Sequence, residues 1–370
     1  MPLDLQISRT DPSHRQIELY VRKQIQLGTL KTGERLPTNM ELARRWGVSC
    51  TAVQKALASL TTEGLLARAP RRGTYVRRLS EKANIGVLFG PTLSEETAYF
   101  YRSILKKLRL EIDDRNSTCR AYDGLSSVAE GSEAHQTQVR KQLMSDLRNY
   151  SFQGLIEFSP DMKWPQEVDA VARLPKASWS ATQHKTDCSF DAYQFGQDSV
   201  RFLAGLGHKR LAFLRTSWHL AQHSDDLDGF LDAIKALGLP EPQIEQLVFT
   251  ALGHDKEREM EEKTERLIRE WTTGSNGRQW PEAILVNDDI IMRGVALALI
   301  RNGVQVPSRV RVLSFASEGV NLHYGIPVVR FEFPTSLVAC HLTDLLWKRM
   351  QGEPEPELPI LVRGKIQNPN

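Results

Sequence analysis

Residues 36–49 read LPTNMELARRWGVS, and this stretch decides the fold of the first part of the chain. Thr38 and Glu41, three positions apart, form a capping box, which is the reciprocal pairing that begins a helix. Gly47 tolerates a positive φ and is therefore the expected turn into a further helix, which Ser49 would cap. The buried side of the first of these two helices is expected to consist of apolar residues at helical spacing: Leu42, Ala43 and Trp46. The stretch thus predicts two short helices joined by a tight turn.

The flanking residues predict one more helix before this pair and a hairpin after it. The earlier helix is expected to begin near Ser13, because a helical apolar stripe follows that residue. After Ser49, the expected buried face of the last helix is an apolar row: Val53, Ala56, Leu57 and Leu60. Two short strands, 65–68 and 74–77, enclose a turn that ends in Gly73. This order of elements is that of a winged helix-turn-helix, whose last helix enters a DNA groove.

Polar side chains on the free face of the last helix are the expected contacts to DNA bases. The candidates there are Ser49, Cys50, Thr51, Gln54 and Lys55. Among them, Gln54 has the donor and the acceptor needed for a bidentate contact with adenine. The preceding helix and the hairpin supply further candidate DNA contacts: Thr38, Arg44, Arg45, Arg68, Arg71, Arg72 and Gly73. The arginines among these would bind phosphates or enter a minor groove.

Charge is distributed unevenly along the 370 residues. Residues 1–80 contain 14 Lys and Arg against 6 Asp and Glu, whereas the remaining residues contain 34 against 39. A basic module joined to a mildly acidic body suits phosphate binding, because Lys and Arg displace the counterions condensed on DNA. The charge distribution therefore agrees with the DNA-binding prediction.

The N-terminal module resembles the GntR family of bacterial regulators over roughly residues 9–78. The matching segments read GERLP (33–37), ELA (41–43), GVS (47–49), AL (56–57), EGLL (63–66) and GTYV (73–76). The family usually has arginine where this chain has Met40, Cys50 and Gln54, and those arginines commonly contact DNA. The resemblance therefore implies a DNA-binding regulator with an unusual operator sequence.

Beyond a polar linker at residues 79–84, short apolar runs alternate with stretches of helical periodicity. The apolar runs lie at 85–89, 154–158, 211–214, 283–286 and 310–315. The helical stretches lie at 97–115, 134–149, 192–206, 226–237 and 256–274. Such alternation predicts parallel sheets built from right-handed crossovers, which bind ligands at the carboxyl ends of their strands. The body is long enough for two such sheets.

Most of residues 84–368 resemble the effector domain of LacI/GalR regulators, which is itself similar to periplasmic sugar-binding proteins. The landmarks are FD (190–191), GHKRLAF (207–213), DGFLDA (228–233), PEAILVND (281–288) and GVQVP (303–307). The resemblance implies two α/β lobes around a cleft, one of them 84–187 with 323–340 and the other 191–318 with the C-terminus. The expected domains are 1–78 for DNA binding, 79–84 as linker and 85–370 for effector binding and dimerisation.

The same resemblance implies effector contacts at Tyr99, Phe100, Ser159, Ser180, Trp218, Asp226, Asn287 and Ala316. Tyr99 and Phe100 would stack on the ligand, although a place in a helix core is the alternative. Asp226 stands where the family has arginine, and Ala316 stands where it has aspartate. Without those two groups the usual sugar-binding mode cannot be transferred. Either the effector differs, with Asp226 favouring a polyol or a cationic group, or the protein has lost small-molecule sensing and responds to a protein partner or to none.

Several other classes of protein are disfavoured by the sequence. No stretch approaches the roughly 18 apolar residues of a membrane span, and the first residues do not read as a signal peptide. The four cysteines are widely separated and include no CxxC, so neither a disulfide framework nor a metal site is expected. Catalytic motifs such as Gly-x-Ser-x-Gly and His-Glu-x-x-His are absent, as is a recognisable pyridoxal-binding lysine of the aminotransferase-like bodies fused to some GntR-type modules.

The sequence therefore predicts an α/β protein with an N-terminal winged helix-turn-helix and a two-lobed body built on parallel sheets. We expect a cytoplasmic, homodimeric transcription regulator that acts as a repressor rather than as an activator. We expect no enzymatic activity, metal or cofactor. Its expected partners are double-stranded operator DNA and a sugar-like small molecule, and no membrane.

Overall fold

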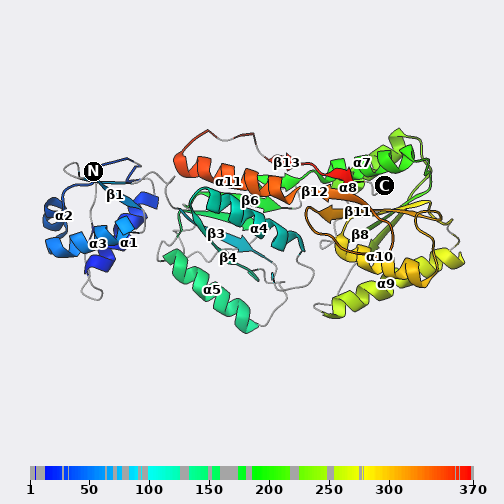
Figure 1. Cartoon of the computed structure of the whole chain (residues 1–370), viewed down its shortest axis with the longest axis horizontal. Coiled ribbons are helices and arrows are strands. Elements are labelled where there is room, and N and C mark those ends of the chain that lie inside the picture. Colours follow the sequence, from blue (N-terminus) through cyan, green and yellow to red (C-terminus); the bar gives the residue numbers. More distant parts are fainter. Residues whose placement is uncertain are drawn as a thin grey trace. The chain divides into compact units, whose positions relative to one another are not determined.

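The structure is a computed structural model of the whole chain (Figure 1). The residues that it describes are 5, 13–26, 29–31, 33–62, 65–69, 73–76, 83–90, 93, 99–125, 133–148, 152–158, 174–180, 186–216, 225–247, 254–274, 277, 279–354, 356–357 and 359–367. The chain divides into two compact units. The first unit comprises Met1–Thr92, Leu105–Trp179 and Ala339–Glu357, and the second comprises Leu93–Ile104, Ser180–Val338 and Leu358–Asn370.

The N-terminal module has the predicted order of elements. Its helices are α1 (Ser13–Gln26), α2 (Asn39–Trp46) and α3 (Cys50–Thr62), and its strands are β1 (Leu66–Ala69) and β2 (Gly73–Val76). The two strands pair antiparallel, as a wing requires. One apolar cluster joins the helices to the hairpin, and it includes Ile17, Leu42, Trp46, Leu57 and Val76. The winged helix-turn-helix prediction is therefore confirmed.

The predicted start of α2 and its turn into α3 are formed by local hydrogen bonds. The Thr38 hydroxyl accepts a bond from the Glu41 amide at 3.3 Å, and the Glu41 carboxylate accepts one from the Thr38 amide at 2.7 Å. The bonds from Thr38 lower the pKa of Glu41. Gly47 ends α2 with a φ of 64°, and the Ser49 hydroxyl accepts the Ala52 amide at 3.1 Å. Because these interactions span only a few residues, the sequence alone predicted them.

The body contains two six-stranded sheets. One has the order β13-β7-β6-β5-β3-β4, with strands β3 (Asn84–Phe89), β4 (Thr118–Tyr122), β5 (Gly154–Phe158), β6 (Lys176–Ser180), β7 (Cys188–Phe190) and β13 (Ile360–Val362). The pairs β3–β4, β3–β5 and β5–β6 are parallel, as expected. The helices of this part of the chain are α4 (Tyr99–Asp114), α5 (Glu133–Arg148) and α11 (Thr335–Gln351). Leu346 of α11 packs directly on Gly154, where a Cβ would lie 2.8 Å from its side chain.

The other sheet has the order β14-β12-β11-β10-β8-β9. Its strands are β8 (Leu211–Thr216), β9 (Gln243–Leu247), β10 (Ala283–Val286), β11 (Arg311–Ser317), β12 (Val329–Phe333) and β14 (Lys365–Gln367). All pairs are parallel except β12–β14. The helices are α7 (Ala192–Gly205), α8 (Asp225–Ala236), α9 (His254–Thr273) and α10 (Asp289–Arg301). Parallel strands alternating with helices confirm the predicted fold class.

Alternating residues of the central strands bury two different cores. Ala212, Leu214, Ile284 and Val286 belong to the core that contains residues of α9 and α10. Their neighbours Leu211, Phe213, Ala283 and Leu285 belong to the core that contains residues of α7 and α8. Figure 1 shows these two helix pairs on opposite sides of the sheet. Because both faces are covered, the strands read as continuous apolar runs, which is why the sequence marked them clearly.

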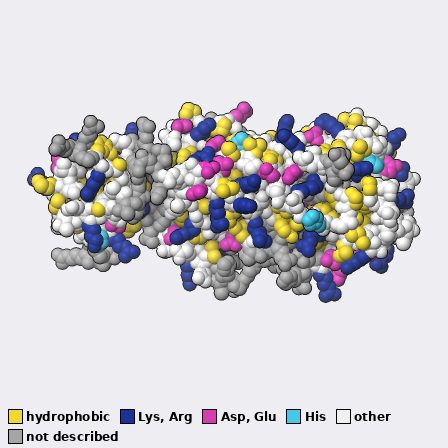
Figure 2. All heavy atoms as spheres, viewed as in Figure 1, with side chains coloured by type: hydrophobic (Ala, Val, Ile, Leu, Met, Phe, Trp, Pro, Cys, Tyr) yellow, Lys and Arg dark blue, Asp and Glu magenta, His cyan; other side chains and the backbone are white. Residues whose placement is uncertain are grey.

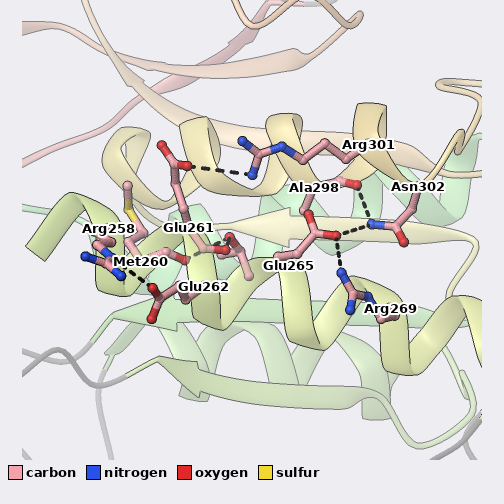
Figure 3. A network of polar contacts seen from close by, with 10 residues as sticks. Arg258, Met260, Glu261, Glu262, Glu265, Arg269, Ala298, Arg301 and Asn302 are labelled. Carbon is pink, nitrogen blue, oxygen red and sulfur yellow. Dashed lines mark hydrogen bonds and ion pairs between the residues drawn. The ribbon is translucent and has the colours of Figure 1, made fainter.

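The outer surface of α9 and α10 is held by polar contacts (Figure 3). The Asn302 amide donates to Glu265 at 2.9 Å, and Glu265 also pairs with Arg269 at 3.1 Å. Arg301 lies 3.7 Å from Glu261, which links the two helices a second time. The Glu265 side chain is only 18% exposed, whereas Arg301 and Glu261 are about half exposed. The exposed pair of Arg301 and Glu261 therefore contributes only about 0–1 kcal/mol to stability.

One part of the predicted division into lobes is wrong. Residues 323–340 were expected to complete the first lobe. However, β12 pairs in parallel with β11, and the chain belongs to the second unit as far as Val338. The physical reason is that Val329, Phe331 and Phe333 are buried in the second unit, with Leu313 in register opposite Val329. The sequence had also not marked β4, β6, β7, β9, α10 or α11. Among the described residues, no helix combines the length and the apolarity needed to cross a bilayer.

Candidate DNA-binding surface and effector site

The third helix of the winged module presents one buried and one exposed face. Val53, Ala56, Leu57 and Leu60 have no exposed surface. Cys50, Thr51, Gln54 and Lys55 are all exposed on the other side. Each of these residues has another of the four at three or four positions along the helix, so their side chains form one continuous surface. We refer to these four residues as the α3 face. Their contacts with DNA remain a prediction.

The remaining candidate DNA contacts have different surroundings. Arg44 and Arg45 are exposed in the last turn of α2, and Arg68 is exposed on β1. Thr38 and Ser49 are exposed but also cap helices, so replacing either would disturb the helix-turn-helix itself. Two further candidates, Arg71 and Arg72, lie outside the described residues.

Gly73 adopts a φ of 111°, which only glycine takes readily. A Cβ at Gly73 would lie 2.8 Å from the Arg35 side chain. Gly73 is therefore needed for the shape of the hairpin, independently of any contact with DNA.

The N-terminal module and the body differ in their balance of charged residues. On the face drawn in Figure 2, acidic and basic side chains are interspersed over the body, without a large patch of one sign. The excess of basic over acidic residues lies in residues 1–80. In that module, the cations Arg44, Arg45, Lys55 and Arg68 are exposed. Side chains of this kind bind phosphates in protein–DNA complexes.

In the second unit, a buried polar cluster lies where two neighbouring strands end. Arg215 is near the end of β8, Asn287 directly follows β10, and Asp226 is in the first turn of α8. Asp226 Oδ1 accepts a bond from Arg215 Nη2 at 3.2 Å, and its Oδ2 accepts one from Asn287 Nδ2 at 3.0 Å. The Arg215 and Asp226 side chains are only 4% and 12% exposed. Asp226 and Asn287, both predicted from the sequence, are thus brought together.

This cluster is also tied to the backbone. The Leu227 amide donates to Asp226 Oδ1 at 2.9 Å, and Asn287 Oδ1 accepts the Thr216 amide at 3.0 Å. Both oxygens of the Asp226 carboxylate therefore already have protein donors. A cationic ligand at Asp226 would have to compete with Arg215 for this carboxylate.

Arg215 was missed by the sequence reasoning, although a signal existed. It follows directly on the apolar run LAFL (211–214), and an arginine at the end of a buried strand requires a buried partner. Which partner it takes could not be read from the sequence, since Asp226 and Asn287 are far away along the chain.

The other candidate effector residues are more scattered. Phe100 contacts Phe333 with ring centroids 6.0 Å apart, and Phe333 also contacts Phe190 and Phe315. Phe100 is half-buried and packs against this aromatic cluster, while its stacking on a ligand remains a prediction. Tyr99 and Ser180 are half-buried, and Ala316 is buried on β11. The candidates Ser159 and Trp218 lie outside the described residues.

A second polar group follows β11 and was not expected from the sequence. The Glu318 carboxylate accepts bonds from the Ser336 amide at 2.8 Å and from its hydroxyl at 2.6 Å. The Ser103 hydroxyl donates to the Glu318 carbonyl at 3.1 Å and lies 3.1 Å from the Thr335 hydroxyl. These bonds hold the first turn of α11 and the first turns of α4 to the end of β11. Their role is therefore to position helices within the second unit.

The fold defines a class of protein: a winged helix-turn-helix module with an exposed polar face on α3, joined to an α/β body with two largely parallel sheets. Residues 13–76 match the profile of bacterial regulatory proteins of the gntR family, and residues 200–367 match the periplasmic binding protein-like domain. The N-terminal module is therefore of the gntR type, and residues 200–367 form a domain of the periplasmic-binding-protein-like type.

The curated relatives differ in how much of this chain they match. The HTH-type transcriptional repressor STM4068 of Salmonella typhimurium is 28% identical over 148 residues, which are 37% of this chain and 57% of that protein. The arabinose metabolism transcriptional repressor of Geobacillus stearothermophilus is 24% identical over 321 residues, covering 83% of this chain and 82% of the relative. This chain thus spans little more than half of the length of the first of these relatives.

Solved structures share the fold of the body. A LacI family transcriptional regulator from Lactobacillus casei with bound sucrose aligns with a TM-score of 0.53 and 18% identity, covering 77% of this chain and 98% of that one. A periplasmic binding protein/LacI transcriptional regulator from Alkaliphilus metalliredigens, complexed with D-xylulofuranose, aligns with a TM-score of 0.54 and 18% identity over 77% and 97%. At this identity the likeness establishes the fold of the body alone.

Proposed function

We propose that this regulator is a repressor that binds double-stranded operator DNA as a homodimer, and that a small molecule bound to the body controls this binding. The observation that carries the proposal is the α3 face, which is exposed and polar on a helix whose other side is buried in the core of a basic module. A two-fold dimer would read two related half-sites. The two relatives described above are named repressors, which supports repression.

The effector that we propose is a sugar or a related polyol. Two structures with the same fold hold sucrose and D-xylulofuranose, and sheets of this kind bind ligands at the carboxyl ends of their strands. The cluster of Arg215, Asp226 and Asn287 lies at such an edge in this chain. We propose residues 1–78 as the DNA-binding domain, 79–84 as the linker and 85–370 as the domain for effector binding and dimerisation. The protein would act in the cytoplasm, where the DNA is, without catalysing a reaction.

Lys55→Ala and Arg68→Ala are expected to lower affinity for all duplexes and to flatten the salt dependence of binding. Removing the cation that neutralises one phosphate reduces the slope of log K against log salt by about 0.9. Fluorescence anisotropy with labelled duplexes between low and moderate salt measures this slope. Lys365→Ala, an exposed lysine of β14 in the body, is the matched control and should leave the slope unchanged. An unaltered slope for both module variants would contradict phosphate binding by α3 and the wing.

A true effector is expected to raise the thermal midpoint of the full chain. Ligand at one hundred times its Kd stabilises the folded state by about 2.7 kcal/mol. A panel of neutral sugars, polyols, sugar phosphates and sugar acids tests this by differential scanning fluorimetry, and any hit should also change the Kd for operator DNA. A panel without any shift would favour the second candidate function, a regulator without small-molecule control.

A further inference from the structure

The side chains of the α3 face are of unusual chemistry for reading DNA. The first residues of a recognition helix contact base edges, and here these are Cys50, Thr51 and Gln54. None of the three is cationic, whereas guanine is most often read by arginine or lysine. All three are exposed on one face of α3, and their neighbours Val53 and Leu57 are buried, so no rotation of the helix could present other residues. The base-reading part of the surface therefore consists of a thiol, a hydroxyl with a methyl group and an amide.

These groups match the major-groove edge of A·T base pairs. Gln54 can donate to adenine N7 and accept from adenine N6 as a bidentate partner. The Thr51 methyl group and the Cys50 thiol are small apolar groups, and the thymine 5-methyl is the apolar group that the major groove offers.

The cations of the module lie outside this group of three. Arg44 and Arg45 are in the last turn of α2, and Arg68 is on β1. Lys55 is the single cation of the α3 face, and it lies one position beyond Gln54. Cations at the edge of a base-reading surface suit phosphates, which fix position without reading sequence. This distribution therefore assigns base contacts to the uncharged residues of α3 and phosphate contacts to the surrounding cations.

We propose that this protein specifies A·T base pairs at the centre of each operator half-site, through adenine at Gln54 and through thymine methyl groups at Cys50 and Thr51. The inference rests on the proposed DNA-binding function. It names the base class that the α3 face selects and the groups on the DNA that carry the selection.

Selection of bound duplexes from a random library by the full chain is the first test. The half-sites recovered should carry A·T pairs at the positions where the Gln54→Ala variant no longer prefers any base. Replacing single thymines in the best duplex by deoxyuridine removes only the 5-methyl group. Each methyl group in contact should then be worth about fourfold in Kd. Gln54→Arg should change the preference at its position from adenine to guanine, by about tenfold or more.

Lys55→Ala is the matched control, since it lies on the same helix face and should weaken selected and scrambled duplexes equally. Thermal midpoints equal to that of the wild type confirm that each variant folds. Selected half-sites with guanine at the Gln54-dependent position, or uniform indifference to deoxyuridine, would overturn this inference while leaving DNA binding intact. Failure to bind any duplex even at low salt would instead overturn the proposed function, and the inference with it.

Discussion

Gly196→Ala is expected to destabilise the second unit by about 3 kcal/mol or more, at the upper end of what overpacking does. Helices α7 and α8 cross closely at two glycines. A Cβ at Gly196 would lie 2.2 Å from the Asp226 carbonyl oxygen and 2.5 Å from the Phe230 nitrogen. These are backbone atoms, so no side-chain rotation can relieve the contact, and the two helices must move apart. Thermal or urea unfolding of the full chain measures the loss of stability.

Gly205→Ala provides the control on the same helix. Gly205 is the last residue of α7, and an added Cβ there would meet nothing within 4 Å. Alanine favours a helix over glycine by up to about 1 kcal/mol, so Gly205→Ala should be neutral or slightly stabilising. A reciprocal variant, Gly229→Ala, would place its Cβ 2.1 Å from the Tyr193 carbonyl oxygen and should resemble Gly196→Ala. Equal midpoints for Gly196→Ala and Gly205→Ala would show that α7 and α8 are not this closely packed.

Asp226→Ala is expected to destabilise the second unit by about 3–5 kcal/mol, because it removes the carboxylate that pairs with the buried Arg215 guanidinium at 3.2 Å. The variant also removes the acceptor of the Asn287 amide and of the Leu227 backbone amide. Chemical denaturation of the full chain measures the effect on the unit that contains α8. Asp232→Ala, also on α8, is the control. Its carboxylate accepts only an exposed hydrogen bond from Tyr193 at 2.7 Å, so its removal should cost no more than about 1 kcal/mol.

A double substitution distinguishes a broken ion pair from poorer packing. Replacing both charges, as in Arg215→Met with Asp226→Leu, should recover much of the stability, since apolar residues of similar volume often replace a buried pair without loss. If Asp226→Ala unfolds like the wild type, then Asp226 does not compensate Arg215. In that case the pairing with Arg215 would not oppose the binding of an effector at Asp226, which the sequence had suggested.

The N-terminal module could be predicted almost completely from the sequence, because its deciding interactions are local. The capping box of Thr38 and Glu41 spans four residues, and the left-handed turn needs only Gly47. The face that α3 exposes follows from the spacing of its buried residues, such as Val53 and Leu57. These expectations were confirmed, whereas the contacts of the α3 face with DNA remain predictions.

The candidate effector site was predicted only in part. Asp226 and Asn287 were chosen separately, and the structure joins them at 3.0 Å beside Arg215, which the sequence reasoning had overlooked. Residues 323–340 were placed in the wrong lobe, because that placement came from the resemblance, and the sequence pattern had not marked β12, which pairs with β11. Phe100 was a choice between ligand stacking and core, and its contact with Phe333 places it against other aromatic rings.

The sequence by itself determined the order of helices and strands in the N-terminal module, the alternation of apolar runs with helices in the body, and the residue types on the exposed face of α3. Each of these depends on neighbours within about one or two turns of chain, where spacing and side-chain type decide the outcome. Only the tertiary structure decided which sheet takes β12, how closely α7 approaches α8 and which carboxylate compensates Arg215. Those outcomes depend on residues far apart in the chain, and the packing of whole elements brings them together.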